Sequence, residues 1–160
     1  MIVNAGMEGL REHLVKSLRG GQAFVPFKKA LEGIRPELRS VRPRKELHSI
    51  YEELEHMRLA QKDLLDFALD PKWKPPKWPE MFWPLPGKEA SDEEWKGTVN
   101  GFFKDMNRAI RLAKDQKIDL LSFVPETENT YLREIMLIVE HNAYHLGKIL
   151  DIRKALGNWK

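Results

Sequence analysis

The sequence predicts an all-α protein, a four-helix bundle made by one domain that spans residues 1–160. Four stretches of the chain repeat apolar residues at the spacing of an amphipathic helix, and no stretch alternates apolar and polar residues for long enough to predict a strand. A segment rich in proline and tryptophan separates the second helical stretch from the third. Four helices with one long central connection are typical of a helix bundle.

The first helical stretch runs from about Met7 to Gly33. Gly20 and Gly21 lie in its middle, and each costs a helix about 1 kcal/mol relative to alanine. Pro26 follows them, so we expect a kink or a close approach of another helix there. The apolar positions of this stretch are Leu10, Leu14, Leu18, Phe24, Phe27, Leu31 and Ile34.

The second and third helical stretches share one N-terminal signal. Ser49 and Glu52 have the spacing of a capping box, in which each side chain bonds the backbone N–H of the other residue. Ser91 and Glu94 repeat that spacing. We therefore expect a second helix from near Ser49 to the Asp70–Pro71 pair, and a third that starts at Ser91. The apolar stripe of the third helix is Trp95, Val99, Phe102, Met106, Ile110 and Ala113.

The fourth helical stretch runs from about Thr130 to Leu156. Gly157 follows it, and glycine commonly ends a helix because it adopts the left-handed conformation without strain. We therefore expect a single long helix near the C-terminus.

Residues 71–90, the crossover segment, differ from the rest of the chain. They hold six of the ten prolines and three of the five tryptophans, so they cannot be helical throughout. Fully extended, such a segment reaches on the order of 65 Å, which is enough to run the length of a bundle. The second and third helices are therefore expected to lie parallel, and the aromatic residues predict that the segment packs against the helices.

The composition excludes several classes of protein. The chain of 160 residues is 42% hydrophobic, too apolar for a disordered chain, and it has no cysteine for a disulfide, a thiolate metal site or a nucleophile. No apolar run approaches the roughly 18 residues of a membrane span. The first residues, MIVNAGMEGLREHL, lack the layout of a signal peptide. We therefore expect a cytoplasmic protein with no membrane partner.

The charge pattern does not predict a nucleic-acid partner. There are 27 Lys and Arg against 24 Asp and Glu, a formal net charge of +3, whereas nucleic-acid binding needs a concentrated basic face. The basic residues between Arg35 and Lys45 are interrupted by Glu37 and have no aromatic residue among them. We interpret this segment as a solvated connector rather than a phosphate or nucleic-acid site.

Histidines supply the clearest candidate for chemistry. His141 and His145 stand at i and i+4 of the fourth helix, so both rings emerge on one side. At 100° per residue, His145 falls within about 20° of the centre of the apolar face and His141 about 60° to one side. Buried imidazoles need polar partners. The pair is either one satisfied core histidine with a surface neighbour, or part of a metal site.

A metal site needs a third donor, and His56 on the second helix is the best candidate. His13 and His48 are the other histidines available. Three neutral imidazoles suit Zn²⁺ or another borderline divalent ion such as Ni²⁺. Because three protein ligands leave an open position, this pattern is typical of catalytic rather than structural sites, and the ion lowers the pKa of bound water or thiol.

Other side chains are candidates for a substrate pocket or a general base. Trp95, Phe102 and Phe103 have helical spacing and are expected in the core. Trp78 and Trp83 lie in the crossover segment and are less readily assigned to a core, so they are candidates to line a pocket for an apolar substrate. Glu52 and Glu134 are the candidates for a general base.

Several separated motifs, in order along the chain, resemble those of the DinB/YfiT-like superfamily. The segment 140–147, EHNAYHLG, resembles its closing signature. The segment 48–56, HSIYEELEH, resembles its second-helix motif, a serine-capped helix that ends on a ligand histidine. The pieces FWP at 82–84 and EEW at 93–95 resemble the approach to its third helix. Together they span nearly the whole chain.

The resemblance implies a fold and a ligand set. It implies a four-helix bundle with up-down-down-up topology, in agreement with the parallel pair of helices expected from the crossover segment. It also implies a divalent metal, often zinc or nickel, held by His56, His141 and His145. One departure concerns Lys148, where the family often has glutamine. This cation would bind an acidic substrate group, weaken the support of the ligands, or face solvent.

The resemblance also implies a class of function. Characterised members include S-transferases that use low-molecular-weight thiols such as bacillithiol or mycothiol, and a thiol-dependent isomerase. We therefore expect a metal-dependent enzyme of the thiol S-transferase type, with a small electrophilic substrate and a low-molecular-weight thiol as co-substrate. The alternatives are a metal-dependent hydrolase that uses metal-bound water and a non-catalytic, stress-associated metal-binding protein. Dimerisation is common among members, so a homodimer is compatible with the resemblance.

Overall fold

A computed structural model of the protein describes the backbone of residues 2–159 and the side chains of residues 6–159. Within that range the regular secondary structure is helical, and the one strand-like pairing is an isolated bridge between Phe123 and Thr130. The predicted all-α class is therefore confirmed. The elements are α1 (Ile2–Arg19), α2 (Phe27–Leu31), the 3₁₀ turn η1 (Pro36–Leu38), α3 (Ile50–Leu69), α4 (Asp92–Lys114) and α5 (Tyr131–Ala155).

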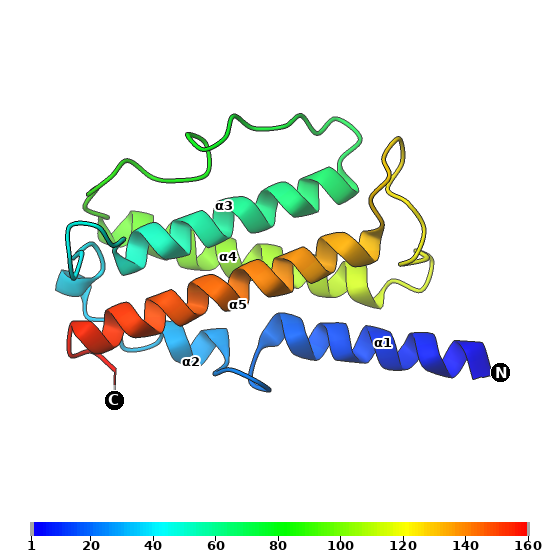
Figure 1. Cartoon of the computed structure of the whole chain (residues 1–160), viewed down its shortest axis with the longest axis horizontal. Helices are drawn as coiled ribbons and strands as arrows, with labels where there is room; N and C mark the ends of the chain where they lie inside the picture. Colours follow the sequence, from blue (N-terminus) through cyan, green and yellow to red (C-terminus); the bar gives the residue numbers. More distant parts are fainter. Residues whose placement is uncertain (1, 160) are drawn as a thin grey trace.

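Four long helices pack side by side around a shared core. Helix α3 packs against α4 and α5, and α1 packs against the same two helices (Figure 1). Figure 1 also shows α3 and α4 running in one direction, α1 and α5 running in the other, and the crossover segment returning along the outside of α3. All five α-helices contribute to one buried apolar cluster. Among the described residues, no helix combines the length and apolar character needed to cross a lipid bilayer.

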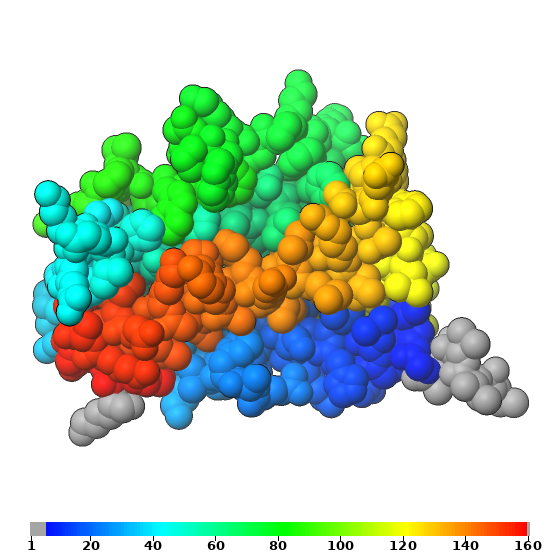
Figure 2. All heavy atoms as spheres, in the orientation of Figure 1, coloured from blue at the N-terminus to red at the C-terminus, as the bar shows by residue number. Residues whose placement is uncertain are grey.

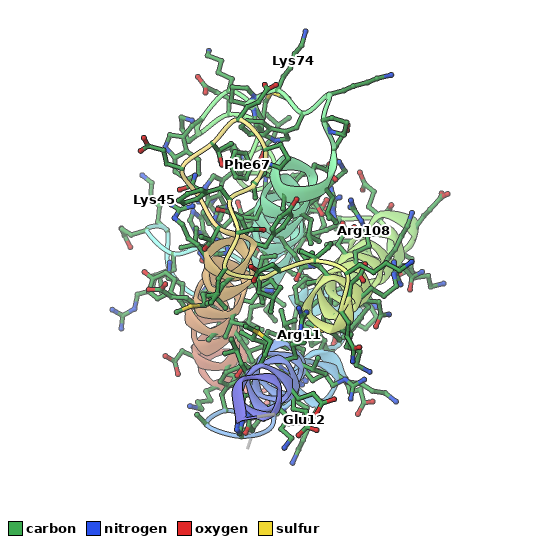
Figure 3. All side chains as sticks on the ribbon, turned by 90° about the vertical axis from the view of Figure 1, so that its right-hand side faces the viewer. Arg11, Glu12, Lys45, Phe67, Lys74 and Arg108 are labelled. Atoms are coloured by element: carbon green, nitrogen blue, oxygen red, sulfur yellow. The ribbon has the colours of Figure 1, made fainter. Side chains whose placement is uncertain are left out.

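The end-on view places the helices around a common centre, with Arg11 on the inner side of α1 and Glu12 on its outer side (Figure 3). Arg11 is buried, and its guanidinium donates hydrogen bonds to the carbonyls of Ala113 at 2.8 Å and Ile118 at 2.6 Å. A cation is favourable there because the last carbonyls of a helix carry partial negative charge. This side chain therefore attaches α1 to the C-terminal end of α4.

The first helical stretch is not one continuous helix from Met7 to Gly33, as the periodicity suggested, but two. Helix α1 already includes residue 2 and ends at Arg19, and α2 starts only at Phe27. Gly20 and Gly21 have φ of 72° and 90°, the left-handed region that glycine adopts without strain. The backbone N–H of Gly21 bonds the Phe24 carbonyl at 2.8 Å and closes the turn. The glycines thus break the helix rather than kink it.

The predicted ends of α3 and α5 and the predicted start of α4 are confirmed. Ser49 and Glu52 form both bonds of a capping box on α3, and Ser91 and Glu94 do the same on α4. Thr130 caps α5 through its side chain, which accepts a hydrogen bond from the Arg133 N–H at 3.2 Å. Gly157 follows α5 with φ of 65°. These boundaries were predictable because they depend on neighbouring residues alone.

A buried polar bridge fixes three helices relative to one another. The side-chain amide of Asn142 on α5 donates to the side-chain oxygen of Gln61 on α3 at 2.7 Å. Gln61 in turn donates to the Phe102 carbonyl on α4 at 2.8 Å. Because buried amides are costly without partners, this bridge favours one register of the helices. Asn142 is the neighbour of His141 in the sequence, so the bridge also fixes the position of His141 along α5 relative to α3.

Candidate metal centre

Three histidines from two helices converge on one point. His56 comes from α3, and His141 and His145 come from successive turns of α5. One ring nitrogen from each lies within 4.8 Å of the other two. His56 and His145 are buried and His141 is half-buried, as expected from their positions relative to the apolar face. Of the remaining histidines, His13 is exposed on α1 and takes no part in the cluster.

Hydrogen bonds orient two of the rings so that one nitrogen of each remains free. The Nδ1–H of His56 donates to the Phe82 carbonyl at 2.8 Å. The Nδ1–H of His145 donates to the Glu53 carboxylate at 2.5 Å. Each neutral ring then has a lone pair on Nε2. Metal-ligating histidines are held in this way, with the second nitrogen bonded to a carbonyl or carboxylate.

The geometry between His56 and His141 indicates whether these residues fit a metal ion. Their Nε2 atoms lie 3.1 Å apart, and His141 Nδ1 is buried without a hydrogen-bond partner. A neutral His141 either donates from Nε2 and leaves Nδ1 unpaired, or carries its proton on Nδ1 and turns two lone pairs toward each other. Tetrahedral zinc, with bonds of about 2.0–2.1 Å, separates its nitrogen ligands by about 3.3 Å. The spacing and the facing lone pairs therefore fit a bound ion.

Two of the three histidines, His56 and His141, have pKa values that suit a metal ligand. Burial lowers the pKa of His56 to about 4. Burial, together with the neighbouring His145, lowers the pKa of His141 to about 4 as well. Both rings are therefore neutral at pH 7, and metal binding needs no proton to be removed from them.

A buried carboxylate, Glu53, supports the cluster from the side of His145. It also accepts a hydrogen bond from His48 Nδ1 at 2.9 Å, and Lys148 Nζ lies 3.8 Å away. Burial alone would raise the pKa of Glu53, but the hydrogen bonds of His145 and His48 outweigh it and lower the pKa. Glu53 is therefore a carboxylate that raises the basicity of His145 as a ligand.

Sequence reasoning missed Glu53, although a signal for it existed. Glu53 precedes His56 by three residues, so the two side chains share one face of α3. Lys148 does not simply face solvent, since it lies beside Glu53 and its ammonium is 4.6 Å from the centre of the Tyr144 ring. His48, which the sequence offered as a spare ligand, instead bonds Glu53.

Neither predicted general base belongs to the cluster. The Glu52 carboxylate accepts hydrogen bonds from Arg42 and from the backbone N–H groups of Ser49 and Gly87. Glu134 is buried and paired with Arg133 at 2.7 Å. Both expectations are corrected here: the acid close to the histidines is Glu53.

The crossover segment covers the histidines, and in Figure 2 its atoms stand above α5 on the face shown. The indole of Trp83 stacks on the His56 ring with centroids 3.8 Å apart and an interplanar angle of 4°. The His48 ring packs against the same indole at 4.1 Å. Because Phe82 also supplies the carbonyl that orients His56, residues 82 and 83 hold this ligand in place.

An apolar cleft of about 690 Å³ opens beside the cluster. Two members of the cluster, His56 and His141, form part of its wall, and His145 does not. A cleft of this size is within the range of small-molecule sites. Its apolar walls are Ala60, Leu64, Trp78, Phe82, Leu137 and Tyr144.

Comparisons of this chain with known protein families, curated proteins and solved structures find no match.

Proposed function

We propose that this chain is a divalent-metal-binding protein of the DinB/YfiT-like kind, in which His56, His141 and His145 hold zinc or nickel. The proposal includes the up-down-down-up four-helix bundle, and the parallel course of α3 and α4 in Figure 1 supports it. The observation that carries the proposal is the convergence of three imidazole nitrogens within 4.8 Å beside an open apolar cleft.

The proposed activity is a metal-dependent transfer to a low-molecular-weight thiol. When bound, a divalent ion would lower the pKa of a coordinated thiol or water and so supply a nucleophile at neutral pH. In the reaction the thiol gives its proton to solvent, its sulfur bonds an electrophilic carbon, and the leaving group departs with the bonding electron pair.

Residues of this chain prepare the site for such a reaction. The Phe82 carbonyl and the Glu53 carboxylate hold His56 and His145 in the tautomer that leaves Nε2 free. Trp83 covers one face of His56 and keeps water from it. The apolar walls of the cleft place a small electrophile next to His56 and His141.

A thiol-dependent reaction tests the proposal. Zinc-loaded and nickel-loaded protein are incubated with 1-chloro-2,4-dinitrobenzene and a panel of thiols that includes bacillithiol and mycothiol. Chloride release that depends on thiol, is lost in His141→Ala and is retained in His13→Ala is expected. His13 is the matched control because it is exposed on α1 and lies outside the cluster.

The hydrolase alternative uses the same histidines. It predicts release of nitrophenol from an aryl ester at a rate that does not depend on added thiol. Its support is the open position that three protein ligands leave on an ion. Metal-loaded protein that accelerates neither reaction would contradict both activities and leave a non-catalytic metal-binding role.

A further inference from the structure

We propose that the cleft beside the histidines takes an apolar small molecule without negative charge. This inference deepens the proposed function and rests on it for the reaction, whereas binding in the cleft is measured independently of the metal. It follows from the nature of the walls and from the sign of the charges that line them.

The walls come from three separate parts of the chain. Helix α3 supplies Leu64, the crossover segment supplies Trp78 and Phe82, and α5 supplies Leu137 and Tyr144. A molecule in the cleft therefore contacts aromatic and aliphatic surface on several sides, and burial of apolar area is its main source of affinity. Trp78 is 65% exposed and Tyr144 is 62% exposed, so both keep apolar surface available to a ligand.

The charged side chains that line the cleft are both acidic. Asp63 and Glu140 belong to its walls, and no lysine or arginine does. The Asp63 carboxylate accepts a hydrogen bond from the Trp73 indole N–H at 2.8 Å, which holds it in place. An anionic group on the body of a ligand would meet two carboxylates, and repulsion by the half-buried Asp63 is screened less than repulsion by the exposed Glu140.

Lys148, which lies beside Glu53, does not line this cleft. Lys148 lines a different, smaller cavity of about 370 Å³, together with Glu53 and His48. Its charge is directed at Glu53, 3.8 Å away. The two cavities therefore differ in the charged groups of their walls, and the cleft without a lysine is the one that His56 and His141 line.

A matched pair of fluorescent probes tests the inference. N-phenyl-1-naphthylamine is uncharged, and 1-anilinonaphthalene-8-sulfonate is the same molecule with one sulfonate. We expect the uncharged probe to bind at one site per chain, with a dissociation constant at least about tenfold lower than that of the sulfonate. A tenfold ratio corresponds to a difference of about 1.4 kcal/mol in binding free energy. Equal affinities, or tighter binding of the sulfonate, would overturn the proposal.

Two neighbouring residues of α5 locate the probe. Leu137 lines the cleft, whereas Met136 lines a different apolar hollow between α1 and α5. Leu137→Asp is expected to weaken binding of the uncharged probe by about tenfold or more. Met136→Asp is expected to leave it within about twofold, since it removes no contact in the cleft. The reverse pattern, or equal effects, would place the probe elsewhere and refute the assignment.

Glu140→Gln tests the charge selection with little risk to folding, because Glu140 is exposed. The sulfonate should bind about threefold more tightly to this variant, with the uncharged probe unchanged. An unchanged ratio of the two affinities would contradict the electrostatic argument.

Metal content measured on the same samples separates the two proposals. If zinc is bound but the protein does not prefer the uncharged probe to the sulfonate, the cleft inference fails and the metal site stands. If no metal is bound but the preference and the Leu137 effect are found, the cleft is correct and the proposed function fails.

Discussion

At the scale of single residues, the candidate site depends on partners that fix two of the three imidazoles, those of His56 and His145. Glu53 is the clearest of them, because its carboxylate is buried and accepts hydrogen bonds from both His145 and His48. A neutral amide at this position retains an acceptor but loses the charge that makes His145 a stronger ligand.

Glu53→Gln should therefore lower the affinity for zinc by about 10–100-fold, the usual effect of losing such a partner. The affinity is measured by competition with a chromogenic chelator. Glu55→Gln is the matched control on the same helix, since Glu55 bonds Arg58 and Thr98 and not a ligand histidine. Equal zinc affinities of the two variants would contradict this role of Glu53.

The candidate ligand set was predictable from the sequence only in part. The spacing of His141 and His145 fixes their common face on any helix, so their convergence follows from periodicity. The Phe82 carbonyl and the Trp83 indole contact His56 across 26 and 27 residues respectively, and no local pattern specifies such contacts. Local sequence predicted which residues face inward, but not which carbonyl and which indole contact them.

At the scale of elements, Glu52 joins three segments at the start of α3. Its carboxylate binds Arg42 of the basic connector, the N–H of Ser49 and the N–H of Gly87 in the crossover segment. Burial alone would raise the pKa of Glu52, but these hydrogen bonds outweigh it and lower the pKa from 4.5 to about 2. The charged form is thus favoured in the folded protein.

This shift predicts a pH dependence of stability. Because the folded pKa lies below the unfolded one, the stabilising effect is complete above pH 4.5 and is lost as the pH falls toward about 2. Glu52→Gln should be less stable than wild type at pH 7 and should lose less stability over that acid range. Urea unfolding at several pH values measures both. Parallel pH profiles of the two proteins would contradict the prediction.

The break between α1 and α2 leads to a prediction on glycine. Gly20 has φ of +72°, and an added Cβ would lie 2.7 Å from the Phe24 ring. Gly20→Ala should therefore destabilise the protein by about 1 kcal/mol or more. Gly9→Ala, inside α1 with nothing within 4 Å of its Cβ position, should stabilise it by up to about 1 kcal/mol.

Urea unfolding of these two glycine variants beside wild type gives the sign of each change. A stabilising effect of Gly20→Ala would contradict the prediction, because it would show that the turn tolerates a side chain at this position. The apolar periodicity of the first stretch continues across this turn, which is why the pattern suggested one helix. Only the backbone conformation of the glycines reveals the break.

At the scale of the whole molecule, a metal ion would connect parts of the chain that are distant in sequence. His56 and His141 are separated by 85 residues, and the crossover segment is attached to the same point through Phe82. An ion that binds the folded protein and not the unfolded one stabilises the whole fold. The parallel course of α3 and α4 in Figure 1 agrees with the expectation drawn from the length of the crossover segment, and the full up-down-down-up topology remains part of the proposal.

Zinc should therefore raise the free energy of unfolding by about 4 kcal/mol when its free concentration is a thousand times the dissociation constant. Thermal unfolding with zinc and with a chelator measures the difference. The increase should be absent in His141→Ala and unchanged in His13→Ala. A similar increase in both variants would mean that the ion binds elsewhere.

Metal content is the sharpest test of a metal site at His56, His141 and His145. Elemental mass spectrometry is applied to untagged wild type, His141→Ala and His13→Ala, purified side by side and shown by circular dichroism to be folded. We expect close to one zinc or nickel ion per chain in wild type and in His13→Ala, and at most about a tenth of that in His141→Ala. Wild-type protein that holds no metal after reconstitution with Zn²⁺ and with Ni²⁺ would contradict this expectation, as would full occupancy in His141→Ala.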